Sequence, residues 1–309
     1  MLTNSRYSIQ KYLIYGSSLS FLAKNLVFKI FFSTFVADFN INNVLYTYLV
    51  RKIYGILVLT MMVCVACQWQ LKPSAEDVDS APVRLQRYDR IESLYLTTGD
   101  YSALQQMNTY FPMETRLLIE DILHLGQVND PEINVRFLRF FQDSTLQQML
   151  DDVQMQYANV DDIDEELARG FENLKNELPN IDVPVIYTQI GSFDESIIVS
   201  GGKLGVSLDK YLGSDYPFYQ THYDEDQRRM MKRDMIVPDC LSFYLLSLFP
   251  LSTEQDQNQH QRDEHMGRIM WTVNHLLGRM VFDNPHVSAV EEYMLEHAST
   301  TILQLLQQK

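Results

Sequence analysis

The spacing of apolar residues predicts helices along most of the chain after residue 82. In 84–96, every third or fourth residue is apolar, which is the spacing of one helical face. The residues on that face are Leu85, Tyr88, Ile91, Leu94 and Tyr95. Periodicity and end signals together predict further helices over 101–110, 112–125, 144–157, 162–177, 238–248, 263–282, 287–297 and 299–308. The long helix 263–282 is expected to bury Met266, Ile269, Met270, Val273, Leu276, Leu277 and Met280.

Polar residues mark where several of these helices begin. Asp100 is expected to cap the helix that follows it, because its carboxylate can accept hydrogen bonds from the free N–H groups of the first turn. Asp143 or Ser144 is expected to cap the helix over 144–157 in the same way. Asp161 or Asp162, with glutamates three to four residues on, resembles a capping box.

The middle of the chain changes character and predicts strands. Residues 184–191 are β-branched and aromatic, which is typical of a strand. The segments 196–200 and 204–208 flank Gly201 and Gly202, and a glycine pair permits the positive φ of a tight hairpin turn. Helices on either side of a small central hairpin or sheet predict one α+β domain over 84–309, predominantly helical.

A second pattern lies upstream, at 51–67, and indicates a lipoprotein signal peptide. Arg51 and Lys52 precede an uncharged run of 14 residues, shorter than the ~20 that a membrane-spanning helix needs. The small Ala66 then precedes Cys67, so 51–66 is expected to be removed and Cys67 to be lipidated. Cys64 stands where leucine is usual, and an uncleaved anchor or a buried helix stays open as an alternative.

The remaining N-terminal boundaries follow from this leader. Residues 1–50 are interpreted as a mis-assigned start or an N-terminal extension, since a signal peptide normally begins the chain. Residues 67–83 are polar and contain prolines, which is typical of a flexible tether. Gln68 gives no inner-membrane retention signal, which favours an outer-membrane lipoprotein facing the periplasm or the cell surface.

The charge distribution excludes one class of partner. The net charge is −15, but residues 1–66 hold six basic residues and one acid, so the rest carries −20. A domain this acidic repels phosphate backbones, so no nucleic-acid partner is expected. It would also be repelled by anionic lipid head groups, so membrane attachment is expected through the lipid on Cys67.

Cys240, in an apolar stretch, is expected to be a buried thiol.

No complete catalytic or metal-binding motif occurs in the sequence, so no cofactor and no metal are expected. A zinc peptidase of the His-Glu-x-x-His type needs two histidines on one helical face, whereas His260 and His265 are five residues apart. A nucleophile elbow of the Gly-x-Ser-x-Gly type is also missing. A metal-dependent hydrolase would have to assemble its ligands from distant residues such as His222, Asp239, Glu264 and His265.

Two strings carry a resemblance to a known family. They are Gly205-Val-Ser-Leu-Asp-Lys-Tyr-Leu-Gly-Ser-Asp-Tyr-Pro-Phe-Tyr219 and Met235-Ile-Val-Pro-Asp239. With His265-Met-Gly-Arg-Ile-Met-Trp271, they make residues 85–309 resemble the gliding-motility lipoprotein GldB family. The resemblance implies an envelope lipoprotein and a distant, degenerate zincin-like fold. Zincin-like peptidases carry His-Glu-x-x-His after this hairpin, and here Pro238 and Ser242 stand in place of the histidines.

These observations predict a non-enzymatic cell-envelope lipoprotein that scaffolds or binds an envelope protein partner of the gliding or secretion type. Clustered aromatic residues suit interfaces. The expected contact surface is therefore Tyr211, Asp215, Tyr216, Phe218 and Tyr219. The same rings could instead fill the core between hairpin and helix. The alternative functions are a metal-dependent hydrolase or peptidase of zincin-like fold with non-standard ligands, and a binder of a small ligand or peptide.

Overall fold

The computed structural model describes residues 83–252 and 258–308. These residues belong to one compact unit, Ser80–Lys309. The predictions for 1–50, for the leader 51–66, for Cys67 and for most of the tether 67–83 lie outside the described residues. Within the described residues, no helix has both the length and the apolar character needed to cross a bilayer.

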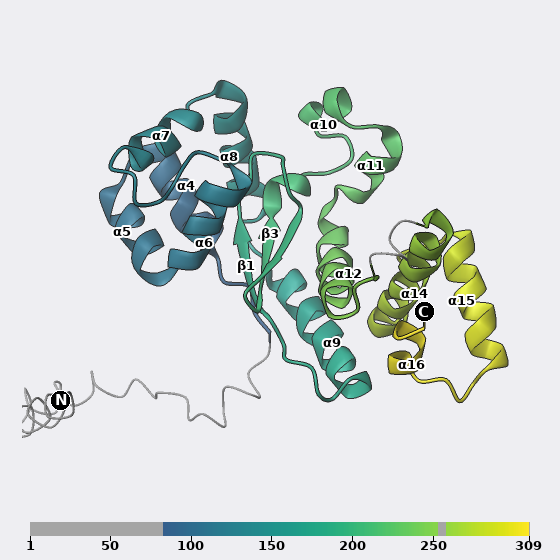
Figure 1. Cartoon of the computed structure of the whole chain (residues 1–309). Helices are drawn as coiled ribbons and strands as arrows, with labels where there is room; N and C mark the ends of the chain where they lie inside the picture. Colours follow the sequence, from purple (N-terminus) through teal and green to yellow (C-terminus); the bar gives the residue numbers. More distant parts are fainter. Residues whose placement is uncertain (1–82, 253–257, 309) are drawn as a thin grey trace, which may run out of the picture. The chain divides into compact units, whose positions relative to one another are not determined.

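A three-stranded sheet lies at the centre of this unit (Figure 1). The strands are β1 (Val185–Gln189), β2 (Ile197–Ser200) and β3 (Lys203–Ser207), in the order β1-β3-β2. β2 and β3 pair antiparallel, and their turn places Gly201 at φ 56° and Gly202 at φ 75°. β1 pairs parallel with β3. The predicted hairpin is confirmed, and the structure adds the parallel partner that completes the sheet.

Helices precede and follow the sheet, so the predicted helical α+β class is confirmed. Those before it are α4 (Tyr88–Thr98), α5 (Tyr101–Tyr110), α6 (Pro112–Arg116), the π-helix η1 (Leu117–Ile122), α7 (Ile133–Phe140), α8 (Ser144–Gln156) and α9 (Asp161–Glu177). Those after it are the 3₁₀ helix η2 (Leu208–Lys210), α10 (Pro217–His222), α11 (Glu225–Met230), the 3₁₀ helix η3 (Arg233–Met235), α12 (Ile236–Leu248), α14 (Gln259–Leu277), α15 (Pro285–Glu296) and α16 (Ile302–Leu306).

The predicted N-caps Asp100 and Asp143 are confirmed. Asp100 accepts a hydrogen bond from the Ser102 N–H at 2.7 Å, and Asp143 accepts one from the Thr145 N–H at 2.8 Å. The expected capping box at Asp161 or Asp162 is wrong. Val160 is the N-cap residue there, without a side-chain cap hydrogen bond, because the nearby carboxylates make tertiary contacts instead.

The predicted helix over 112–125 is wrong in its second half. The α-helical turns end at Arg116, and the chain continues as a π-helix in which the Leu123 N–H donates to the Leu118 carbonyl at 2.8 Å. The expected core positions Leu94 and Met280 are also wrong, with 44% and 74% of their surfaces exposed. Met280 lies outside the core because α14 ends at Gly278, which has φ 63°.

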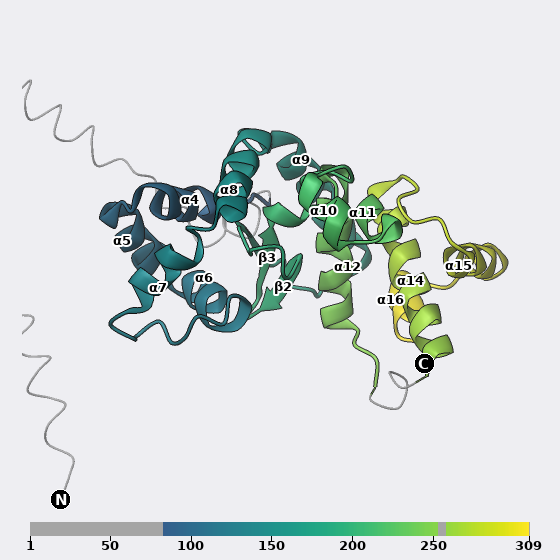
Figure 2. The ribbon, with the colours of Figure 1, turned by 90° about the horizontal axis from the view of Figure 1, so that it is seen from above.

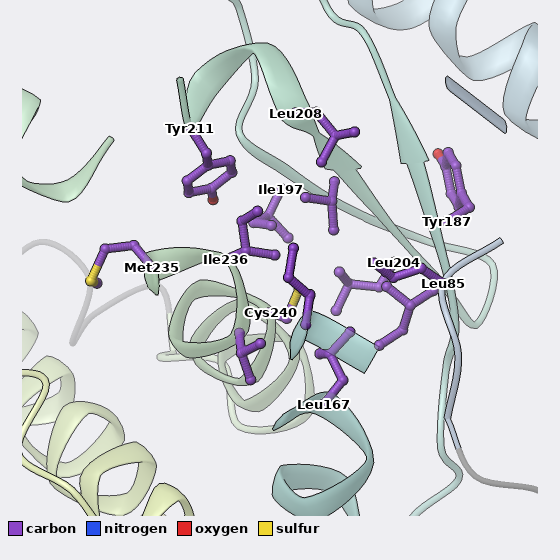
Figure 3. Close-up of a cluster of buried hydrophobic side chains, with 14 of the residues drawn as sticks. Leu85, Leu167, Tyr187, Ile197, Leu204, Leu208, Tyr211, Met235, Ile236 and Cys240 are labelled. Carbon is purple, nitrogen blue, oxygen red and sulfur yellow. The ribbon is translucent and has the colours of Figure 1, made fainter. Parts of the chain in front are cut away.

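α12 contacts β2 and β3 and, on another side, α9 and α14 (Figures 1 and 2). Figure 3 shows the core that results, where side chains of the sheet meet side chains of α9 and α12. Cys240 is fully buried in that cluster, and burial raises the pKa of its thiol. A buried, protonated thiol is a weak nucleophile, as expected for a structural cysteine.

Candidate functional site

A pocket of about 380 Å³ opens where the chain leaves β1. Four segments that are distant in the sequence line it: the end of η1, the end of α7, the turn after β1, and α10 with the residue that follows it. The lining residues are Ile122, Leu123, His124, Phe140, Gly191, Ser192, Phe193, Asp194, Phe218, His222 and Tyr223. The pocket is therefore mainly apolar and aromatic, with two histidines and one carboxylate among its walls.

The backbone of this pocket is unusual. Among the described residues, the non-glycine residues with positive φ are His124 (50°), Ser192 (59°) and Phe193 (66°), and all three line the pocket. Such conformations are uncommon for residues with a Cβ and persist only where the surroundings impose them. The π-helix also ends directly before this wall, and π-helices recur at functional sites. The irregular backbone of this domain is therefore concentrated around one cavity.

Buried carboxylates hold the turn after β1 in place. The Glu92 carboxylate accepts from the Ile190 N–H at 2.9 Å. The Asp209 carboxylate accepts from the N–H groups of Gly191 and Phe193 at 2.7 and 2.5 Å. Burial raises the pKa of Glu92 and of Asp209, and the backbone hydrogen bonds partly oppose that shift. These bonds satisfy N–H groups that would otherwise be buried without partners, and they fix the two positive-φ residues.

Three rings form a stack that runs from the core to the pocket surface. The rings of Phe193 and Phe218 are 3.9 Å apart, as are those of Phe218 and His222, and both pairs are nearly parallel at 11°. Phe193 is buried, Phe218 is half-buried and His222 is exposed. The edge of Tyr219 packs against Phe193 from the core side. The outer ring therefore rests on a rigid aromatic base.

Both pocket histidines have one nitrogen engaged with the backbone. The Nδ1 of His222 is 2.8 Å from the Phe218 carbonyl, and the Nδ1 of His124 is 3.3 Å from the Glu120 carbonyl. A carbonyl oxygen can only accept, so these contacts are hydrogen bonds in the tautomer with the proton on Nδ1. The Nε2 of the neutral ring is then a hydrogen-bond acceptor on an exposed side chain. The Nδ1 of His222 also lies 2.7 Å from the Thr221 hydroxyl, which donates to it in the other tautomer.

The structure separates the five residues of the predicted contact surface. Tyr211 and Tyr219 are buried, as expected if these rings fill the core. The Tyr211 hydroxyl donates to Asp239 at 2.8 Å, and the Tyr219 hydroxyl donates to the Asp209 carbonyl. Tyr216 is half-buried and donates to Asp152 at 3.0 Å. Phe218 lines the pocket, and Asp215 is exposed. Partner contact by the accessible residues stays a prediction.

The four residues considered as metal ligands belong to different elements. His222 ends α10, Asp239 lies in α12, and Glu264 and His265 lie in α14. The part of the chain that the structure describes contains no group of three or more His, Cys, Asp or Glu side chains arranged to hold a metal ion. Asp239 is buried, which raises its pKa to about 7, against the lowering effect of the Tyr211 hydrogen bond.

Sequence reasoning missed His124, Ser192 and Phe193, and it named His222 only as a possible metal ligand. A left-handed residue is usually signalled by glycine or asparagine. The segment Ser192-Phe193-Asp194 carries no such signal, and neither does His124. The acceptors that impose the conformation at Phe193 come from Asp209, 16 residues away, so no local pattern could have predicted it.

The comparison with protein families decides the assignment. The model of the gliding motility protein GldB matches residues 68–280, which is more than half of the 309-residue chain. The chain belongs to the GldB family. No curated protein and no solved structure matches it. The zincin-like relationship of the GldB domain stays a prediction. Family membership fits a non-enzymatic role in the cell envelope.

Proposed function

We propose that this GldB-family chain is a non-enzymatic envelope lipoprotein, anchored by lipid on Cys67, that binds or scaffolds an envelope protein partner. The observation that carries the proposal is where the family match begins. It starts at residue 68, directly after the cysteine that the leader pattern marks for lipidation. The leader lies entirely before the match, so the two observations use different residues and support the same boundary.

The proposed anchor is physically sufficient. Two acyl chains hold a protein stably on a membrane, whereas one chain binds only marginally. With Gln68 after the lipidated cysteine, the proposed location is the outer membrane, on its periplasmic face or at the cell surface.

The walls of the pocket after β1 support a binding role for the domain. Its pocket after β1 is built from rings, two histidines and a strained turn that buried carboxylates hold rigid. Rigid aromatic walls favour recognition, because few side-chain rotamers have to be ordered when a partner binds. This supports a binding role for the lipoprotein.

The anchor is tested by the intact mass and detergent phase partitioning of the protein made in its native cell. We expect a mature chain that begins at a diacylated Cys67 and enters the detergent phase. Cys67→Ala should abolish both the lipid mass and the partitioning. Cys64→Ala is the matched control, because it removes the other leader cysteine and should leave lipidation intact. A soluble, unlipidated wild-type chain that keeps residues before 67 would refute the anchor.

A further inference from the structure

From the pocket after β1 we infer a binding site for a cationic side chain, arginine above all, presented by a segment of a protein partner. The inference rests on the proposed partner-binding function and deepens it by naming what the site recognises. It joins three features of the pocket: stacked rings, a lining carboxylate without an ion pair, and histidine acceptors.

The first feature is the aromatic surface. Cations are attracted to the faces of aromatic rings, and guanidinium groups also stack on them. Lys210 already uses this attraction here, since its Nζ lies 4.7 Å from the centre of the Tyr223 ring, one wall of the pocket. Phe140 also lines the cavity. Phe218 has Phe193 on one face and His222 on the other, so the exposed ring that this stack offers is that of His222. Lys210 donates to the Tyr223 hydroxyl and to the Phe193 carbonyl, so it holds this wall of the pocket in place.

The second feature is negative charge without a counter-ion. Asp194 lines the pocket, and Asp121 and Glu195 are the sequence neighbours of lining residues. All three are exposed, and no ion pair within the described residues reaches them. A cationic group entering the pocket would therefore meet one lining carboxylate, that of Asp194, which makes no ion pair within the described residues. An anionic ligand would be repelled at the same rim.

The third feature selects arginine. In the tautomer with the proton on Nδ1, the Nε2 atoms of His124 and His222 are acceptors on two residues that line the pocket. A guanidinium carries five N–H donors in a plane, so it can stack on a ring while donating to several acceptors at its edge. A lysine ammonium is a compact point charge and cannot do both as well.

Arg233 shows the same recognition inside this protein. Its guanidinium lies 5.0 Å from the centre of the Tyr157 ring, and it donates to Asp162 and to the carbonyls of Gln156 and Asn159. Ring, carboxylate and neutral acceptors surround one guanidinium there. The pocket after β1 brings together the same three kinds of group without a guanidinium of its own.

The test uses the purified lipidated chain in a neutral detergent and calorimetric titration with a blocked peptide, Gly-Gly-Arg-Gly-Gly. The matched peptide carries citrulline, which keeps the shape of arginine and removes its charge. We expect at least about tenfold weaker binding of the citrulline peptide, because the Asp194 carboxylate and the ring faces of the pocket select for charge. Equal affinity for the two peptides would overturn the inference.

Three variants locate the binding. Phe218→Ala and His222→Ala should each weaken the arginine peptide about fivefold, and Asp194→Asn should weaken it comparably. His222 is exposed, so its variant remains informative even if Phe218→Ala disturbs α10. Glu292→Gln removes one exposed charge from α15 and should change nothing. Equal losses from Asp194→Asn and Glu292→Gln would mean general attraction to an acidic domain and would overturn the site.

A lipid source of the cation is excluded by a separate titration. Vesicles of phosphatidylethanolamine present a primary amine, and we expect no binding to them that the arginine peptide displaces. Binding to these vesicles with none to the peptide would overturn the protein partner. Lipidation at Cys67 is measured independently, so a failed peptide titration with normal detergent partitioning would reject this site and leave the anchored lipoprotein standing.

Discussion

Two pockets of this domain differ in whether the charged residues that line them form ion pairs. The larger, about 650 Å³, lies between α9 and the start of α12, and its walls include Asp162, Glu166 and Arg233. Arg233 pairs with Asp162, and Arg279 pairs with Glu166, so these charges stabilise the fold. The smaller pocket after β1 is lined by Asp194, which makes no ion pair within the described residues, and by three non-glycine residues with positive φ. The larger groove therefore has charges that stabilise the fold, whereas the smaller pocket is the one that we propose as a binding site.

The largest effect should come from removing the acceptor under the strained turn. Asp209→Ala leaves the buried N–H groups of Gly191 and Phe193 without partners, and we expect a loss of about 3 kcal/mol in the free energy of unfolding. Urea denaturation followed by circular dichroism measures it. Asp194→Ala, at the exposed rim, should cost less than about 0.5 kcal/mol. Equal stabilities of the two variants would contradict the view that Asp209 holds the pocket.

Two carboxylates of the domain, Asp162 in the groove and Asp239 in α12, should also respond oppositely to pH. Hydrogen bonding to Arg233 lowers the pKa of Asp162 in the groove. The stability that this ion pair contributes is therefore fully present above the pKa that Asp162 has in the unfolded chain, and it is lost as the pH falls through the lower pKa of the folded protein. Burial raises the pKa of Asp239 to about 7. The folded state then holds a proton that the unfolded state has lost, so this contribution to stability falls as pH rises between about 4 and 7.

Asp239→Asn should remove that second dependence. We expect wild type to lose about 2.5 kcal/mol relative to the variant between pH 5 and pH 7, at about 1.4 kcal/mol per pH unit. Urea midpoints of both proteins at several pH values measure the difference. Parallel stability curves for wild type and variant would show that Asp239 does not titrate in this range.

A smaller effect should follow from breaking the charge pairing of the groove. Arg233→Ala removes hydrogen bonds to Asp162 and to two backbone carbonyls, and we expect a loss of about 2 kcal/mol. Arg229 makes only exposed pairs with Glu225 and Asp226, so Arg229→Ala should cost less than about 0.5 kcal/mol. If Arg233→Ala were as mild as Arg229→Ala, the contrast between a structural groove and a binding pocket would fail.

Much of the secondary structure was predictable because its causes are local. The glycine pair of the β2–β3 turn needs positive φ, and Asp100 and Asp143 cap helices that begin at the next residue. Predictions failed where a tertiary partner replaced the local one. Asp162, one of the two expected caps of α9, pairs with Arg233, 71 residues away, and α9 has no side-chain cap.

The candidate site was predictable only in part. The aromatic string before α10 marked Phe218, but it could not separate that ring from Tyr211 and Tyr219, which are buried. Their difference in exposure depends on what packs beside them. His124 reaches the pocket only because the π-helix ends in front of it, and nothing in the apolar spacing of 112–125 indicated that change of helix type.

The sequence by itself determined the helical α+β class, the hairpin, the family and the expectation of a lipid anchor at Cys67, because periodicity, turn residues and leader composition act over a few neighbouring residues. Only the tertiary structure decided where the pocket lies. Its walls come from segments as far apart as residues 122 and 223, and the Phe193 conformation depends on a carboxylate 16 residues away. Sequence patterns encode local conformational preference, whereas a pocket is a property of distant segments that pack together.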